Sequence, residues 1–129
     1  MSDKTTVASW LKQMADSVKK RDLAAHMKLV SKNVHVYGVP GKEVIDYAGW
    51  KERRKNEFSK GLLESISYSE PRLKIIALRR IAFSVEETMR AHNGDAVMIH
   101  KDVVLEQEHD ARWRVVEERV KDYRLEQAP

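Results

Sequence analysis

A carboxylate on an apolar strand face is the most informative chemical feature of this sequence. Residues 81–90 alternate in character, and Glu87 falls on the same face as Phe83, Val85 and Met89. Burial of a carboxylate costs free energy unless it is paired and raises its pKa, which suits a general base. The alternative is that the strand reaches a solvated edge there, or that a bulge reverses the face.

Two other side chains complete the candidate catalytic group of Glu87, His100 and Tyr37. His100 lies on the segment after the Asn93-Gly94 turn and has the same parity as Met98 and Asp102. A neutral imidazole near a carboxylate can carry a proton near pH 7. Tyr37 ends a short apolar segment, where its hydroxyl could donate a hydrogen bond or its ring could simply pack. A structural role is the alternative for each residue.

A metal site built from His35, His100 and Asp102 is conceivable, but the spacing does not support it. The sequence has neither Glu-x-x-His nor His-x-His, and it has no Cys. Zinc sites usually combine such ligands at short, regular spacings. We therefore expect no metal and no other cofactor.

Large apolar residues recur at spacings that place them on shared faces, and they are candidates for the wall of a ligand pocket. The candidate lining residues are Trp10, Met14, Trp50, Arg54, Phe58, Phe83, Val85 and Met98. An apolar cleft with few polar groups is typical of small-molecule sites, although each apolar residue could equally belong to the core. Arg54 could anchor an anionic or carbonyl ligand, or extend to solvent.

The first half of the chain has helical periodicity and the second half has strand periodicity. Apolar spacings of three and four residues predict helices over 5–20, 23–30 and 48–60, with a short strand over 33–37 and an irregular loop around 44–47. Alternation and turn residues predict strands over 62–68, 73–78, 81–92, 96–108 and 113–123. Helices first and strands last favour an α+β fold, with three N-terminal helices packed on a curved, mostly antiparallel sheet.

Composition narrows the classes of protein to consider. A length of 129 residues is enough for one domain over 1–129 with a hydrophobic core. The composition, 42% hydrophobic and 34% charged, excludes an intrinsically disordered chain. No apolar run is long enough for a membrane helix and the first residues lack a signal-peptide pattern, so we expect a soluble, cytoplasmic protein without a membrane partner.

The net charge of +4 is unevenly distributed along the chain. Residues 1–60 contain 13 Lys or Arg against 7 Asp or Glu, whereas residues 61–129 contain 11 against 13. The basic excess includes the run Lys51–Lys55, which could contact nucleic acid. Because acidic residues interleave with the basic ones and no RNA-binding motif is present, a solvated helix face is the favoured interpretation and nucleic acid is not an expected partner.

The order of these features resembles the nuclear-transport-factor-2-like superfamily, and within it the SnoaL-like polyketide cyclase and ketosteroid isomerase branch. The resemblance covers residues 5–121 and is carried by a first helix with Trp10, the segments Asn33–Gly38 and Val44–Trp50, and a late hairpin. That hairpin, Asp110–Val115, is similar to the family's Asp-Gly-x-Trp-x-Ile pattern. The resemblance implies a cone-shaped α+β barrel with a deep pocket between helices and sheet, and frequent homodimers.

Family members differ widely in activity, so the resemblance does not decide the function. Ketosteroid isomerases have an Asp base just after the first strand, where this chain reads Val36-Tyr37-Gly38-Val39-Pro40. Two functions stay open. The first is a small-molecule pocket protein that binds a mid-sized apolar or aromatic ligand, possibly with acid–base isomerisation, cyclisation or hydrolysis through Glu87. The alternative is a non-catalytic homodimeric binding or interaction module.

Overall fold

The computed structural model describes residues 2–129 and has the helices-then-sheet order that the sequence predicts. The helices are α1 (Asp3–Lys19), α2 (Leu23–Met27) and α3 (Tyr47–Lys60). The strands are β1 (Val30–Tyr37), β2 (Val44–Ile45), β3 (Ser65–Tyr68), β4 (Arg72–Ala77), β5 (Arg80–Arg90), β6 (Ala96–Gln107) and β7 (Trp113–Glu126). The helices account for most of the first half of the chain, and the long strands for most of the second half.

Local sequence signals fix the ends of the helices. The side chain of Ser2 accepts a hydrogen bond from the Thr5 backbone at the start of α1, and Asp46 does the same for Gly49 at the start of α3. Such caps satisfy backbone N–H groups that have no partner within the helix. Gly61 ends α3 in the left-handed conformation, with φ of 65°, as expected for glycine after a helix.

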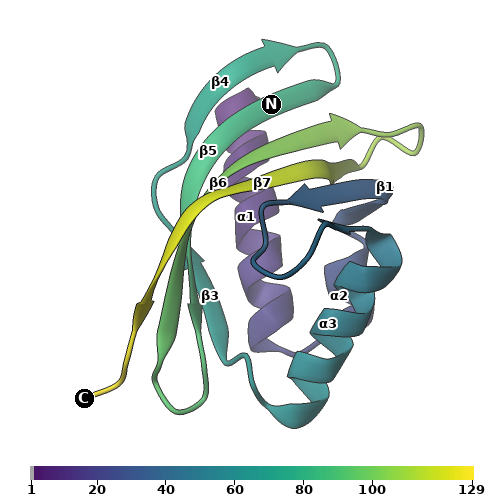
Figure 1. The fold of residues 1–129 in the computed structure, drawn as a ribbon. Helices are drawn as coiled ribbons and strands as arrows, with labels where there is room; N and C mark the ends of the chain where they lie inside the picture. The colour runs from purple at the N-terminus through teal and green to yellow at the C-terminus, as the bar shows by residue number, and fades with distance from the viewer. Residues whose placement is uncertain (1) are drawn as a thin grey trace.

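Within residues 2–129, seven strands form one mixed sheet in the order β2-β1-β7-β6-β5-β3, with β4 also paired to β5. All pairs are antiparallel except β1 with β7, which run parallel. Figure 1 shows the long strands β5, β6 and β7 curving across the molecule, with α2 and α3 together on one side and α1 behind the sheet. This confirms the predicted α+β class with helices on a curved, mostly antiparallel sheet.

Several bounds differ from the sequence prediction, and the last strand, β7, continues to Glu126 rather than ending at residue 123. The second helix ends at Met27 rather than residue 30, because Val30 already begins β1 and pairs with Val115 of β7. The predicted loop near residue 44 contains β2, which extends the sheet beside β1. The strand predicted from residue 62 starts at Ser65, and Leu62 is exposed.

The core lies between the helices and the inner face of the sheet. The stripe of α1 predicted from spacing is buried, including Val7, Trp10, Leu11 and Met14. The inner face of the sheet contributes fully buried apolar side chains, among them Phe83. No helix of residues 2–129 is both long and apolar enough to cross a membrane.

Candidate functional site

A cavity of about 640 Å³ lies between α3, the end of β1 and the inner face of β5, β6 and β7. Most of its wall is apolar and includes Ile45, Trp50 and Ile99. Leu62 and Leu125, which are exposed, also line it, so the cavity extends from the core to the surface. Its volume and apolar wall are those of a site for a small molecule.

Three charged side chains from three neighbouring strands meet at the cavity wall. The Lys101 Nζ donates hydrogen bonds of 3.0 Å to Glu87 Oε2 and of 3.0 Å to Glu118 Oε1. The side chains of Lys101, Glu87 and Glu118 are 5%, 3% and 6% exposed, and all three residues line the cavity. One buried cation thus stands between two buried carboxylates, an arrangement that we call the Glu–Lys–Glu cluster.

The two carboxylates of this cluster have opposite pKa shifts. Burial alone would raise the pKa of Glu87, but the positive charges of Lys101 and Arg54 outweigh it and lower the pKa. For Glu118, burial raises the pKa, Lys101 opposes the shift and the negative charge of Glu87 adds to it, so the pKa is raised. Two carboxylates whose pKa values are driven apart are suited to different roles in proton transfer.

Two buried oxygen atoms near this cluster have no hydrogen-bond partner among residues 2–129. They are the second carboxylate oxygen of Glu118, Oε2, and the hydroxyl of Tyr68. Burial, followed by the negative charge of Glu87, raises the pKa of Tyr68 well above its usual value, so its hydroxyl stays protonated. Because buried polar atoms are nearly always paired, the free acceptor on Glu118 is an unusual feature of the cavity wall.

A second polar group supports the cavity wall from behind. The Nε2 atom of His26, which is fully buried, accepts hydrogen bonds from Trp50 Nε1 at 3.0 Å and from Arg54 Nε at 3.3 Å. Arg54 also forms a 2.7 Å ion pair with Glu57. Trp50 and Arg54 lie one turn apart on α3, and this imidazole therefore holds both side chains at the cavity wall.

The hydrogen bonds of His26 determine its tautomer. Its Nδ1 lies 2.9 Å from Ser17 Oγ, and this hydroxyl already donates to the Met14 carbonyl. Nδ1 must therefore carry the proton and donate to Ser17, while Nε2 is the acceptor. Burial, with the positive charges of Arg54 and Lys101, lowers the pKa of His26 to about 3. The ring is neutral at physiological pH.

The strand register explains how the Glu–Lys–Glu cluster forms. In the antiparallel pair of β5 and β6, Val85 lies opposite Lys101 and Glu87 opposite Ile99, so Glu87 and Lys101 are diagonal neighbours on the inner face. The β6–β7 register shifts between Leu105, which faces Val115, and Val104, which faces Glu117. This bulge reverses the alternation of β7, so that Glu118 rather than Glu117 is buried.

The structure brings three of the sequence-predicted residues together at the cavity: Glu87, Trp50 and Arg54. Five other candidates for its lining are core residues, away from the cavity wall among residues 2–129: Trp10, Met14, Phe58, Phe83 and Val85. They share the inner side with the cavity, but they are enclosed by other apolar side chains. Their spacing identified the buried side without distinguishing core from cavity.

The predicted site differs from the observed cavity at three further positions. None of Met98, His100 and Tyr37 is in the described lining of the cavity. Met98 and His100 have the opposite parity to Lys101, which places them on the outer face of β6. His100 has a 53% exposed side chain and lies 3.9 Å from Asp122. Tyr37 is half-buried and stacks with His35, while the Arg119 guanidinium carbon lies 4.3 Å from its ring centroid.

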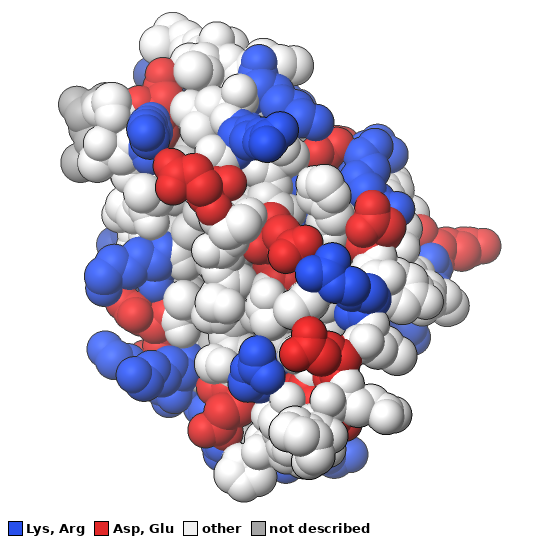
Figure 2. All heavy atoms as spheres, turned by 90° about the vertical axis from the view of Figure 1, so that its left-hand side faces the viewer, with Lys and Arg blue, Asp and Glu red and all other residues white. Residues whose placement is uncertain are grey.

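The outer face that carries His100 is a charged surface. Cross-strand ion pairs such as Lys74 with Asp102, at 3.1 Å, and Arg124 with Glu86, at 3.6 Å, connect its strands. Figure 2 views the side of the molecule away from α2 and α3, where acidic and basic side chains are interspersed. Each exposed pair of this kind contributes little to the stability of the fold.

Sequence reasoning missed Lys101, Glu118 and His26. A signal for Lys101 was present, because it alternates with Ile99, Val103 and Leu105 as Glu87 does with its apolar neighbours. No such signal existed for Glu118, whose face depends on a bulge. His26 lies in a helix of only five residues, too short for a periodicity to show which side is buried.

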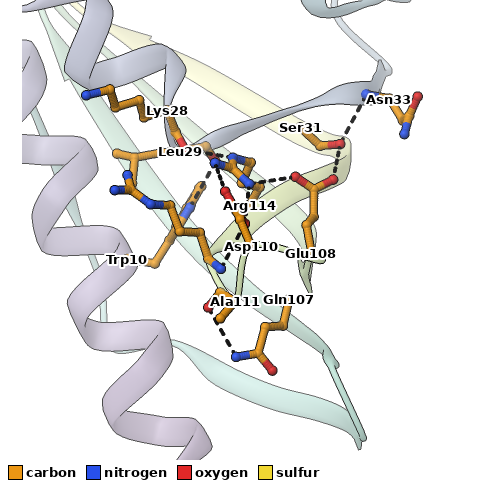
Figure 3. A network of polar contacts seen from close by, with 11 residues as sticks. Trp10, Lys28, Leu29, Ser31, Asn33, Gln107, Glu108, Asp110, Ala111 and Arg114 are labelled. Carbon is orange, nitrogen blue, oxygen red and sulfur yellow. Dashed lines mark hydrogen bonds and ion pairs between the residues drawn. The ribbon is translucent and has the colours of Figure 1, made fainter.

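A separate polar network joins the start of the sheet to its last hairpin (Figure 3). Arg114 donates to the Lys28 carbonyl at 3.0 Å, to Glu108 at 2.9 Å and to both oxygens of Asp110. Glu108 also accepts a 2.8 Å hydrogen bond from Ser31. The hairpin that resembles a family pattern thus has a structural role, because its side chains join β1 to β7.

Among residues 2–129, no three His, Asp or Glu side chains are arranged to hold a metal ion.

Comparison with solved structures identifies the fold. An NTF2-like protein from Cytophaga hutchinsonii superposes with a TM-score of 0.72 over 93% of this chain and 98% of its own, at 16% identity. An NTF2-like protein of unknown function from Pseudomonas putida gives 0.73 over 91% and 84%, at 6% identity. A hexachlorocyclohexane dehydrochlorinase gives 0.64 over 97% and 89%, at 10% identity.

Two comparisons based on the sequence found no match for this chain. No family model matches the chain, and no curated protein matches it. The likeness lies in the order of the elements, the curved sheet and the helices that cover it, over nearly the whole chain. The protein therefore has the cone-shaped α+β fold of the nuclear-transport-factor-2-like superfamily.

Proposed function

We propose that this is a small-molecule pocket protein of the SnoaL-like type, which binds a mid-sized apolar or aromatic ligand and transfers a proton to or from it. The observation that carries this proposal is the Glu–Lys–Glu cluster, a buried group of charges on the wall of an otherwise apolar cavity. Such a cluster is expensive to bury, and perturbed carboxylates in a cavity are typical of acid–base sites.

We propose a different role for each carboxylate of the cluster. Glu118 has the raised pKa and the unpartnered oxygen, so it is the group that accepts a proton from the ligand and returns one. Glu87, with its lowered pKa, stays ionised and keeps Lys101 charged. Lys101 then holds Glu118 in position. Glu87 is thus a positioning residue in this proposal, rather than the base itself.

The reaction that fits is an isomerisation, elimination or cyclisation that begins with removal of a proton. Such reactions need a base in an apolar surrounding and no redox group. The solved structures with this fold include a dehydrochlorinase, whose reaction removes hydrogen and chlorine from its substrate. The name of that protein is compatible with an elimination in this fold.

A ligand screen followed by proton exchange tests the proposal. Compounds that raise the melting temperature are incubated with the protein in D₂O, and exchange of ligand C–H for C–D is followed by NMR. We expect exchange with the wild-type protein and a loss of at least about 100-fold with Glu118→Gln, the scale of one general base. Glu117→Gln is the matched control, since Glu117 is the adjacent residue and pairs with Arg119 outside the cavity.

The pattern of results separates binding from catalysis. Binding without exchange in the wild-type protein would leave a binding cavity and refute proton transfer. Exchange that survives in Glu118→Gln would refute the assignment of the base. Absence of any ligand would count against the small-molecule function as a whole.

An apolar edge favours a second candidate function, a non-catalytic homodimeric interaction module. Ile75, Ile76 and Leu78, on β4 and directly after it, are 63%, 55% and 91% exposed. Exposed apolar residues grouped on one strand are typical of an interface. Analytical ultracentrifugation tests this function: a dimer that becomes monomeric in Ile76→Lys, with no ligand found in the screen, would favour the module over the pocket protein.

A further inference from the structure

The cavity described above has more acidic than basic groups in its wall. Its acidic side chains are Glu57, Glu87, Asp95, Glu118 and Glu126, and its basic ones are Arg53, Arg54 and Lys101. The protein as a whole has a net charge of +4, so the cavity differs in sign from the molecule that contains it. A ligand inside meets this local balance of charge rather than the overall one.

The two inner cations are already committed to carboxylates. Arg54 pairs with Glu57 at 2.7 Å, and its side chain is 11% exposed. Lys101 donates to both Glu87 and Glu118 at 3.0 Å, and its side chain is 5% exposed. The charges of both cations are thus already balanced by carboxylates, and an anionic ligand would add a negative charge to a wall that already has more acidic than basic groups, which is unfavourable.

The atom that lacks a partner in the cluster is an acceptor. Glu118 lines the cavity, is 4% exposed, and its Oε2 has no hydrogen-bond partner in the described structure. A buried carboxylate oxygen is satisfied by a donor, and best by a charged one. A neutral donor such as a hydroxyl would satisfy the hydrogen bond but would not balance the acidic wall.

We infer that the ligand of this cavity is an apolar molecule that carries a protonated amine, with the ammonium donating to the free oxygen of Glu118 and the apolar body against Trp50 and Ile99. This inference rests on the proposed binding of a small molecule and specifies the class of ligand; it does not use the proposed proton transfer, because an ammonium at this oxygen occupies the position that the base needs. It explains both the excess of carboxylates in the wall and the unpartnered oxygen. It also predicts that the binding affinities of compounds of the same shape depend on their charge.

Three probes of one shape test the ranking: 2-naphthylmethylamine, 2-naphthylmethanol and 2-naphthoate, titrated into the protein at pH 7 by calorimetry. We expect the amine to bind tightest and the carboxylate weakest, by roughly 100-fold, since like charges brought together in a buried site are strongly disfavoured. In Glu118→Gln, which keeps the shape of the side chain, the preference for amine over alcohol should fall by about tenfold.

Glu117→Gln is the matched control, because Glu117 is the adjacent carboxylate, pairs with Arg119 and is not in the described lining of the cavity. It should leave the preference for amine over alcohol unchanged. Carboxylate binding as tight as amine binding would overturn the inference while the binding cavity stands. If none of the three probes binds, the small-molecule function itself fails. Should Glu118→Gln not fold, the order of the three probes on the wild-type protein decides alone.

Discussion

Removing the cation of the Glu–Lys–Glu cluster should strongly destabilise the protein. In Lys101→Met the apolar stem is largely kept, but Glu87 and Glu118 each lose a 3.0 Å charge-assisted hydrogen bond inside the protein. Breaking a buried ion pair by removal of one partner costs about 3–5 kcal/mol. The free energy of unfolding of native domains is about 5–15 kcal/mol, so the variant should lose a large part of its stability.

The loss should depend on pH in a definite direction. Without Lys101, burial and mutual repulsion raise the folded-state pKa of the two carboxylates above their unfolded values. The folded state then binds more protons than the unfolded state, so the stability of the variant falls as pH rises through this range. The difference between wild type and Lys101→Met should therefore be larger at pH 7 than at pH 5.

Urea unfolding followed by circular dichroism measures both effects. Lys121→Met is the matched control, since Lys121 lies 3.5 Å from Asp102 with a 55% exposed side chain and should change stability by less than about 1 kcal/mol. A loss below about 1 kcal/mol for Lys101→Met at pH 7, or the same loss at both pH values, would refute the description of the cluster as a buried, charged group.

Three further substitutions test other parts of the structure. Ala111 has φ of 69° in the last hairpin, so Ala111→Gly should raise the free energy of unfolding by about 1 kcal/mol in urea; an unchanged or lower value would contradict the strained turn. Gly38→Ala should lower the free energy of unfolding by about 2 kcal/mol or more, because φ is +83° and a Cβ would lie 2.5 Å from the Val120 carbonyl oxygen. Gly41→Ala should lower it by less in the same assay, because φ is +77° but the space around Gly41 is open. The pKa of His26 is lowered to about 3 in the folded state, so between pH 7 and pH 5 the unfolded imidazole gains a proton and the folded one does not. The stability of the wild-type protein should therefore fall by about 2 kcal/mol more over this range than the stability of His26→Gln. Parallel curves of stability against pH for the two proteins would refute this.

The elements that carry strong periodicity could be predicted from the sequence, and so could part of the site. Apolar spacing predicted the buried stripe of α1, and the alternation of β5 predicted that Glu87 lies on a buried face, because each pattern is local and needs no knowledge of the partner element. Trp50 and Arg54 followed from their spacing of four residues. The distinction between core and cavity did not follow, since Phe83 and Glu87 share one face of one strand.

The rest of the site depends on interactions between distant segments. The buried position of Glu118 is set by a bulge in the β6–β7 ladder, which the alternation of β7 alone does not reveal. The role of His26 comes from contacts with Ser17, Trp50 and Arg54 on two other helices. His100 was misplaced for the related reason that two alternating faces of β6 both contain polar residues, and only tertiary packing shows which one is inner.

The parallel pairing of β1 with β7 has a consequence for the order of folding. β1 follows the first two helices directly, yet one of its two partners in the sheet is the distant strand β7, with Val30 opposite Val115 and Tyr37 opposite Arg119. Contacts between segments so far apart in sequence slow folding and must wait until β7 has emerged from the ribosome. Because β7 also supplies Glu118, the charged cluster cannot assemble before that point, and the nascent chain holds Lys101 and Glu87 without their third partner.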